Sequence, residues 1–365
     1  MPAALPVKKR NIGSNKYNVK GENDDYKNNV GRGGNNFMDE IVNRNRLFYC
    51  SHMNRKNAFF QKHILNAKVP PKQVAHKIFQ EMFGFTRIRK TVRAAILDML
   101  VKVVKNQKHF DYNYYLSKNC PMPANWKERK REMLVEAAKG GESRQAVFKE
   151  LFESESSYRS VADFLTEFVA NVFPSDFITG KNKKIFNKKV YAFVRFNRFE
   201  MFTKITLLDR FQVNEVPWLR FNASKGNAKY FQNENLWIFW RVLKWLFEEC
   251  LISLLRCFFY CTEKQKEYSR IFYFRKNLWA MAMKLSIEDL LKENLRAVEK
   301  REMNSHCENH NFAPGKLRLV PKGDTFRPIM TFNRKLPHTK NMTTNKKLGT
   351  GHMMLKNLKT KMFKH

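Results

Sequence analysis

The feature that most constrains the fold is an apolar run at residues 236–261, which is long enough to be weighed as a membrane span. The run carries five charged side chains, at Arg241, Lys244, Glu248, Glu249 and Arg256. At about 100° per residue these charges fall within one stripe of roughly 140° on a helical wheel. The run therefore predicts an amphipathic helix with a wide buried face, not a membrane helix.

The charge balance points to a polyanionic partner. The 365 residues include 69 Lys and Arg against 33 Asp and Glu, a formal net charge of +36. Nucleic acid is the first candidate, because phosphate neutralisation releases counterions. An acidic membrane surface usually needs a basic amphipathic helix or a lipid anchor. Hydrophobic residues make up 43% of the chain, which excludes a wholly disordered basic tail, and the length suggests about two or three domains or subdomains.

The six cysteines, none in a CxxC pair, indicate reduced thiols. The first ten residues lack the apolar core of a signal peptide, so we expect an intracellular chain. Cys257 and Cys261, with His306, Cys307 and His310, leave a zinc site as the alternative. Buried cysteines are favoured, because no pair of these ligands has the usual knuckle spacing.

The organisation along the chain is mainly helical. Residues 1–40 are rich in Asn, Gly and Lys and predict a disordered basic linker. The mixed charge run at 128–132 predicts a solvated helix face. Apolar residues at three- and four-residue spacing predict helices at 74–83, 92–104 and 161–172.

Two aromatic runs, at residues 257–263 and 270–276, flank a polar connector and predict a β-hairpin. Alternation in the second run places Phe272 and Phe274 on one face, with Tyr273 and Arg275 on the other. After a helical stretch, the segment 286–289 predicts a capping box that opens another helix, which runs to about residue 301.

A second hairpin is predicted from residues 315–320 and 325–332, joined by a turn at 321–324. Gly323 can adopt the positive φ that such a turn requires. Pro328 cannot donate to a ladder, so its strand is expected at an edge.

Aromatic side chains beside cations are typical of proteins that hold unpaired RNA or DNA, because stacking is worth about 1–3 kcal/mol per base. Residues 48–60, 85–90 and 272–279 interleave the two types. For any one segment, core packing is the alternative interpretation. Their recurrence in a chain of this charge favours nucleic-acid binding.

The second hairpin gathers cations over a short span, at Lys316, Arg318, Lys322, Arg327 and Arg334. Cations placed in this way can stabilise the triphosphate in phosphoryl transfer, although basic hairpins are also common on nucleic-acid binders.

Carboxylates suited to two-metal nucleotidyl transfer are not evident. The only adjacent Asp pair, Asp24 and Asp25, lies in the polar tail. The residues alone therefore predict binding without catalysis, with no catalytic residue and no metal ligand assigned.

Four ordered segments resemble motifs of the telomerase reverse transcriptase family, with ciliate-type members the most similar. They are a CP motif at 48–60, a QFP region at 172–182, a T motif at 258–263 and 272–279, and reverse-transcriptase motifs 1 and 2 at 316–322 and 325–330.

The resemblance implies a mainly α, helical telomerase RNA-binding domain at 41–305 with the T-motif hairpin inserted. Residues 306–365 would begin the reverse-transcriptase fingers with a second hairpin. The T hairpin and CP segment would form an RNA groove near the template boundary, which limits how far the template is copied. The family's palm with its catalytic Asp triad, its thumb and its N-terminal domain have no counterpart here, so polymerase activity is not expected of this chain alone.

The implied site residues fall into two groups. Those expected to contact RNA are Phe48, Tyr49, Arg55, Lys56, Phe59, Tyr260, Arg270, Tyr273, Arg275, Lys276 and Trp279. Those expected to face the incoming nucleotide and template are Arg318, Lys322 and Arg327.

The resemblance further implies an RNA-directed DNA polymerase, a nucleotidyltransferase that uses Mg²⁺ in its complete form, with no cofactor bound by this chain. Telomerase RNA, telomeric DNA and accessory telomerase proteins are the expected partners, without a membrane, in the nucleus at telomeres. The alternative is a freestanding, catalytically inert RNA-binding or scaffold protein. An open reading frame beyond His365 that encodes palm aspartates would support the enzyme, and a stop would support the scaffold.

Overall fold

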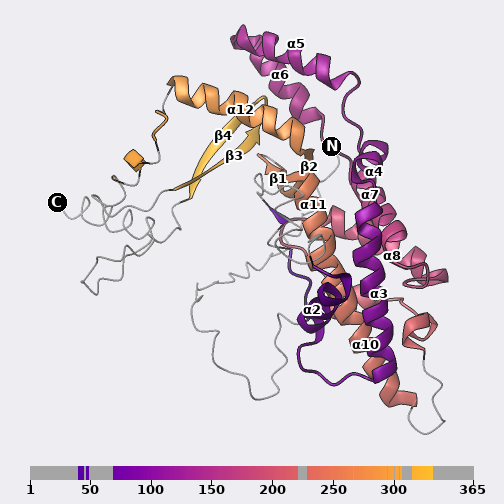
Figure 1. The fold of residues 1–365 in the computed structure, drawn as a ribbon. Coiled ribbons are helices and arrows are strands. Elements are labelled where there is room, and N and C mark those ends of the chain that lie inside the picture. The colour runs from indigo at the N-terminus through magenta and orange to yellow at the C-terminus, as the bar shows by residue number, and fades with distance from the viewer. Residues whose placement is uncertain are drawn as a thin grey trace, which may run out of the picture.

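The computed structural model describes residues 40–44, 47–48, 69–220, 228–265, 267–293, 295–299, 301–303, 305 and 315–331. Helices dominate, and two short antiparallel hairpins lie before and after the last long helix (Figure 1). The helices are α2 (Pro71–Phe83), α3 (Lys90–His109), α4 (Tyr112–Asn119), α5 (Trp126–Ala138), α6 (Gly141–Glu153), α7 (Tyr158–Val172), α8 (Gly180–Arg195), α9 (Lys204–Leu208), η3 (Val213–Glu215), η4 (Pro217–Leu219), α10 (Ala228–Trp245), η5 (Leu246–Leu251), α11 (Ile252–Phe258) and α12 (Lys276–Glu293). The strands are β1 (Phe259–Lys264), β2 (Glu267–Arg275), β3 (Lys316–Lys322) and β4 (Thr325–Thr331).

The predicted mainly helical fold class, with both hairpins, is confirmed. The three helices predicted from apolar spacing are α2, α3 and α7. The proposed division at residue 305 stays a prediction. Of the predicted linker, all but Glu40 lies outside the described residues.

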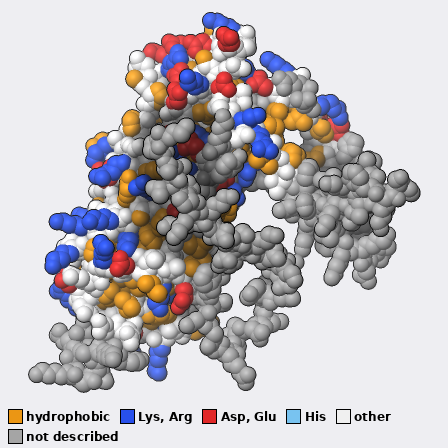
Figure 2. Space-filling model, turned by 180° about the vertical axis from the view of Figure 1, so that it is seen from behind, with side chains coloured by type: hydrophobic (Ala, Val, Ile, Leu, Met, Phe, Trp, Pro, Cys, Tyr) orange, Lys and Arg blue, Asp and Glu red, His pale blue; other side chains and the backbone are white. Residues whose placement is uncertain are grey.

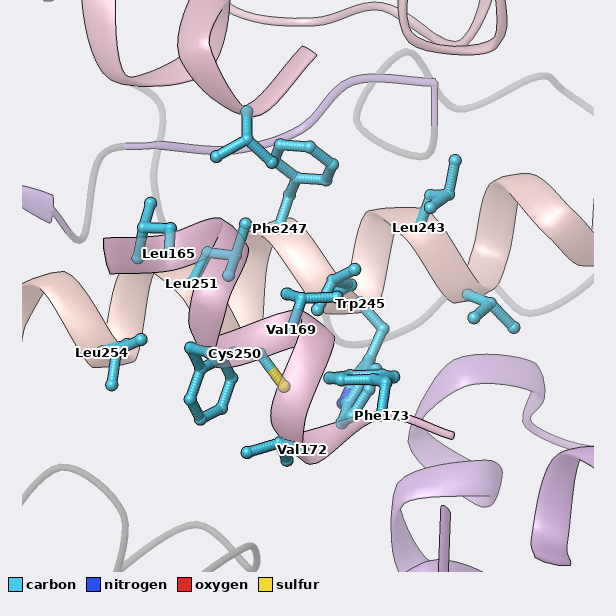
Figure 3. Close-up of a cluster of buried hydrophobic side chains, with 14 of the residues drawn as sticks. Leu165, Val169, Val172, Phe173, Leu243, Trp245, Phe247, Cys250, Leu251 and Leu254 are labelled. Atoms are coloured by element: carbon cyan, nitrogen blue, oxygen red, sulfur yellow. The ribbon is translucent and has the colours of Figure 1, made fainter. Parts of the chain in front are cut away.

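The apolar run forms the central helix of the molecule. Residues 228–258 are helical throughout, as α10, the π-helical turn η5 and α11. Its apolar side chains from Ile238 to Cys257 are buried, and α7 packs against it through Leu165, Val169 and Val172 (Figure 3). The five charges of the stripe are each only half-buried, so the predicted amphipathic helix is confirmed. No helix in the described part of the chain is long and apolar enough to cross a membrane.

A smaller core lies where α5, α6 and α12 meet. Phe148 of α6 and Leu285 of α12 are buried in it. The mixed charge run lies on α5, where the Arg129 guanidinium pairs with the Glu150 carboxylate at 2.5 Å. The other four residues of the run are exposed, so the run faces solvent as predicted.

The predicted capping box is wrong. Ser286 lies inside α12, which continues from Lys276 to Glu293, and its side chain is buried. Apolar residues at Leu278, Met281 and Leu285 keep one face of the helix packed across this point. Continuing the helix keeps this face packed and adds one backbone hydrogen bond for each residue. Together these gains outweigh the local cap pattern at Ser286.

The cysteines of the described residues are not in disulfide bonds. Cys120, Cys250, Cys257 and Cys261 are all buried, as predicted. Among the described residues, no three His, Cys, Asp or Glu side chains are grouped to hold a metal ion. The other cysteines and both histidines of the alternative zinc site lie outside the described residues.

Burial of one of these thiols predicts a stability change at alkaline pH. Burial raises the pKa of Cys120 to about 11, above that of an exposed thiol. The buried neutral thiol of Cys120 therefore contributes to the free energy of unfolding at neutral pH. This contribution is lost as the pH rises from about 9 toward 11, where the thiol ionises. The stability difference between wild type and Cys120→Ala should fall by on the order of 2 kcal/mol over that range. Urea unfolding at several pH values measures it, and a pH-independent difference would contradict the prediction.

Candidate nucleic-acid interface

The first hairpin begins directly after α11, and its two faces are both covered. β1 pairs with β2 in a register that sets Tyr260 opposite Phe274 and Cys261 opposite Tyr273. Paired residues share a face and neighbours alternate, so the predicted separation of Tyr273 from the two phenylalanines is confirmed. Helices of the main core cover one face, and α12 with β4 cover the other.

Tyr273 joins the hairpin to the main helical core. Its side chain is fully buried and its hydroxyl donates to the Val194 carbonyl at 2.9 Å. Its backbone carbonyl accepts a hydrogen bond from the Ser156 amide at 2.8 Å. Burial raises the pKa of the Tyr273 phenol above its usual value.

The opposite face forms an aromatic cluster with the second hairpin. Tyr260 stacks on Trp279 with ring centroids 4.0 Å apart. The Phe274 ring lies 5.3 Å from that of Trp279, and Phe326 of β4 meets the same indole edge-on at 5.4 Å. The two hairpins therefore share a core.

This packing corrects the roles expected for three rings. Tyr260, Tyr273 and Trp279 are each exposed by 3% or less. A ring enclosed in this way has no free face for a base, so in this structure the three rings pack the hairpin and are not placed to stack on RNA.

Arg275 also requires a correction. It is 8% exposed, and its guanidinium donates to the carbonyls of Cys120 and, at 3.4 Å, Leu116 at the end of α4. Burial lowers the pKa of its guanidinium. Arg275 thus satisfies carbonyls at the end of a helix. Because its guanidinium is buried there, it is not placed to bind a phosphate of RNA.

Arg270 is the predicted cation of this hairpin that stays accessible, whereas the ammonium nitrogen of Lys276 is enclosed. Arg270 is exposed, pairs with Glu267 at 2.8 Å and donates to the Tyr158 hydroxyl at 3.0 Å. That hydroxyl and the neighbouring carboxylate raise the pKa of its guanidinium. Lys276 is half-buried at the start of α12. Their contact with RNA stays a prediction.

The CP segment is described only at its first residue. Phe48 is half-buried, packs against the main core and lies 6.0 Å from the Arg198 guanidinium. The other CP residues predicted to contact RNA lie outside the described residues: Tyr49, Arg55, Lys56 and Phe59.

The second hairpin brings its three predicted cations onto one face. The register sets Val320 opposite Arg327, and alternation places Arg318 and Lys322 on the same face. Lys322 and Arg327 are exposed, whereas Arg318 is half-buried. Gly323 takes a φ of +60° in the turn, as predicted.

A cleft of about 790 Å³ lies between the tip of the first hairpin and the turn of the second. It is lined by cations and carboxylates in equal number, which does not favour a simple phosphate site. These side chains are Lys149, Lys264, Lys322, Glu153, Glu267 and Asp324.

Two cations that hold neighbouring segments in place were not predicted from the sequence. Arg44 is 3% exposed, donates to the carbonyls of Asn197 and Glu200 at 3.1 Å, and lies over the Phe193 ring at 4.9 Å. Lys264 lies 4.3 Å from the Phe272 ring and donates to a carbonyl of α6. Neither follows an apolar period, so no pattern predicts either role.

The surface charge is unevenly distributed. Figure 2 shows Asp and Glu side chains mainly at the top of the molecule, with Lys and Arg spread over the remaining surface in view. This arrangement suits a long polyanion better than a single small anion.

Comparison with known proteins shows which family the chain resembles. Residues 160–290 match the family model described as the RNA binding domain of the telomerase ribonucleoprotein complex, a span that contains the first hairpin. The chain is 58% identical over 358 residues to the telomerase reverse transcriptase of Oxytricha trifallax and 43% identical over 356 residues to that of Euplotes aediculatus. Each alignment covers 96% of the chain. The chain is similar to telomerase reverse transcriptases over nearly all of its own length.

Solved telomerase structures share the fold of this chain. Telomerase from Candida albicans, in complex with a TWJ fragment of telomeric RNA, matches with a TM-score of 0.62 at 19% identity, over 80% of this chain and 38% of that one. Apo telomerase from Candida tropicalis, truncated from its C-terminal domain, gives 0.61 at 16% identity, over 87% of this chain and 54% of that one. The chain spans 31% and 34% of the two relatives named above.

Proposed function

We propose that this chain binds telomerase RNA as the RNA-binding domain of a telomerase reverse transcriptase. In the complete protein it would support RNA-templated synthesis of telomeric DNA and help to define the template boundary. The observation that carries this proposal is the family match across residues 160–290, which contains the T hairpin. The net charge of +36 supports it, since phosphate contacts dominate RNA affinity.

The structure suggests how the hairpins would contribute. Their buried rings fix both hairpins to the helical body and to each other. The exposed cations Arg270, Lys322 and Arg327 are then held on a rigid support. Rigid placement lowers the entropy lost on binding, so these side chains would position phosphates of the template or the incoming nucleotide.

The polymerase chemistry is proposed for the complete enzyme. There the protein would act as an RNA-directed DNA polymerase, with Mg²⁺ and palm aspartates that lie outside this chain. The described residues hold no carboxylate group suited to a metal, so no catalytic step is derived for them. Telomeric DNA, accessory telomerase proteins and the nucleus at telomeres are proposed as partners and location.

Titration of the chain with its cognate telomerase RNA and with a scrambled RNA of equal length, at several salt concentrations, tests RNA recognition. We expect binding to weaken with salt and the cognate RNA to be preferred by at least about tenfold, or about 1.4 kcal/mol. Equal affinity for the two RNAs would reduce the function to generic polycation binding.

A further inference from the structure

The loop between α2 and α3, at residues 84–89, holds an aromatic ring out in solvent. Phe85 is 100% exposed. Gly84, at a φ of +56°, ends α2, and its amide donates to the Gln80 carbonyl at 2.7 Å. On either side of Phe85, Phe83 is buried and Ile88 packs against the main core. Both ends of the loop are therefore fixed, and the ring between them projects outward.

Single exposed apolar residues are common, so exposure alone assigns no role. Two other exposed rings in the described part of the chain have neighbours across them. The Arg198 guanidinium lies 5.4 Å from the Phe199 ring, and Tyr115 meets Tyr114 edge-on at 5.1 Å. Phe85 differs because its complete exposure leaves both ring faces open.

The charges around Phe85 are strongly one-sided. Residues 71–93 contain six Lys and Arg and one carboxylate, at Glu81. Arg89 is used internally, since it pairs with Glu234 at 2.9 Å and donates to Asn235. Arg87 and Lys90 are exposed on the two sides of that anchor. An open ring flanked by exposed cations is the combination that holds an unpaired base and its backbone.

The loop is remote from the T hairpin. Its anchor at Glu234 lies 25 residues before β1, which is about 37 Å along a continuous helix at 1.5 Å per residue. Figure 1 shows α2 beside α10, with β3 and β4 toward the opposite end of the molecule. A nucleic acid held here would make a contact separate from the hairpins.

We propose that Phe85 stacks on an unpaired base of single-stranded RNA, while Arg87 and Lys90 neutralise the adjoining phosphates. This site deepens the proposed RNA-binding function and rests on it. An acidic peptide would satisfy the two cations, but it offers no base to the open ring, so RNA is the occupant that uses both features.

The test uses the full chain and two labelled strands, each about twelve nucleotides long. One is oligouridine, whose bases are free to stack, and the other is an abasic strand with the same backbone. Phe85→Ala should weaken oligouridine binding about fivefold or more and leave abasic binding unchanged. Phe85→Trp should restore the affinity, and Phe85→Leu should not. Arg87→Gln with Lys90→Gln should weaken both strands.

Ile205→Ala is the matched control, because Ile205 is 82% exposed beside Lys204 but has no aromatic face. It should change neither affinity. A 4-thiouridine in the oligouridine should crosslink to the peptide that contains Phe85, which detects the site even where other basic surfaces bind the strand. Lack of that crosslink, or an equal effect of Phe85→Ala on both strands, would overturn the proposal.

The outcomes separate this site from the wider function. If wild type prefers telomerase RNA but Phe85→Ala binds oligouridine unchanged, the site fails and the proposed function stands. If the Phe85 effects hold but telomerase RNA and scrambled RNA bind equally, stacking by Phe85 is supported and the proposed function fails.

Discussion

Tyr273→Ala is expected to lower the free energy of unfolding by about 3–5 kcal/mol, the range found for removal of a buried large aromatic side chain. The ring is fully enclosed; its hydroxyl bonds to Val194 of α8, and its backbone carbonyl bonds to the amide of Ser156, two residues before α7. Loss of the ring leaves a cavity between the hairpin and the helices. RNA affinity should fall in proportion to the unfolded fraction, measured by urea unfolding and titration under the same conditions.

Tyr273→Phe is the matched control, because it removes only the hydroxyl that donates to Val194. It should cost about 1 kcal/mol and leave RNA affinity unchanged. If Tyr273→Ala instead kept wild-type stability and lost RNA affinity, the ring would be a base-stacking residue after all. The burial described here would then not hold in solution.

The T hairpin shows which of its features the local sequence pattern could predict. Alternation predicted which side chains share a face, and the register of Tyr260 with Phe274 follows it. The pattern could not predict that both faces are covered. Trp279 is covered by Phe326, which lies nearly fifty residues later in the chain. The alternation of apolar residues within either segment does not indicate such a long-range contact.

The residues of the candidate site also include some whose position could be predicted from the sequence and some whose position could not. The cations Arg318, Lys322 and Arg327 could be placed together because two short runs around a turn specify their own register. Alternation sets Arg270 and Arg275 on opposite faces of the hairpin, but it does not predict which of the two is buried. One reaches the carbonyls at the end of α4 and the other reaches solvent, and only the position of α4 decides between them.

Arg44→Ala is expected to release the segment at residues 40–44 from the helical body. Its guanidinium satisfies two carbonyls after α8 and stacks on Phe193, so the substitution leaves both carbonyls without that donor. Relief of the buried charge offsets part of the cost, since burial lowers the pKa of Arg44. We expect a net loss of about 2–3 kcal/mol in the free energy of unfolding.

Hydrogen exchange provides a local readout of the same change. The Val42 amide donates to the Phe202 carbonyl at 2.8 Å, and the Lys204 amide donates to the Glu40 carbonyl at 2.7 Å. Both amides should exchange at least about tenfold faster in Arg44→Ala if the segment detaches, because local opening then needs less free energy. Arg195→Ala removes an exposed arginine from the last turn of α8 and should change stability by less than about 0.5 kcal/mol. Unchanged exchange at both amides in Arg44→Ala would show that backbone pairing alone holds the segment, because the charge and the ring contact would then contribute nothing measurable.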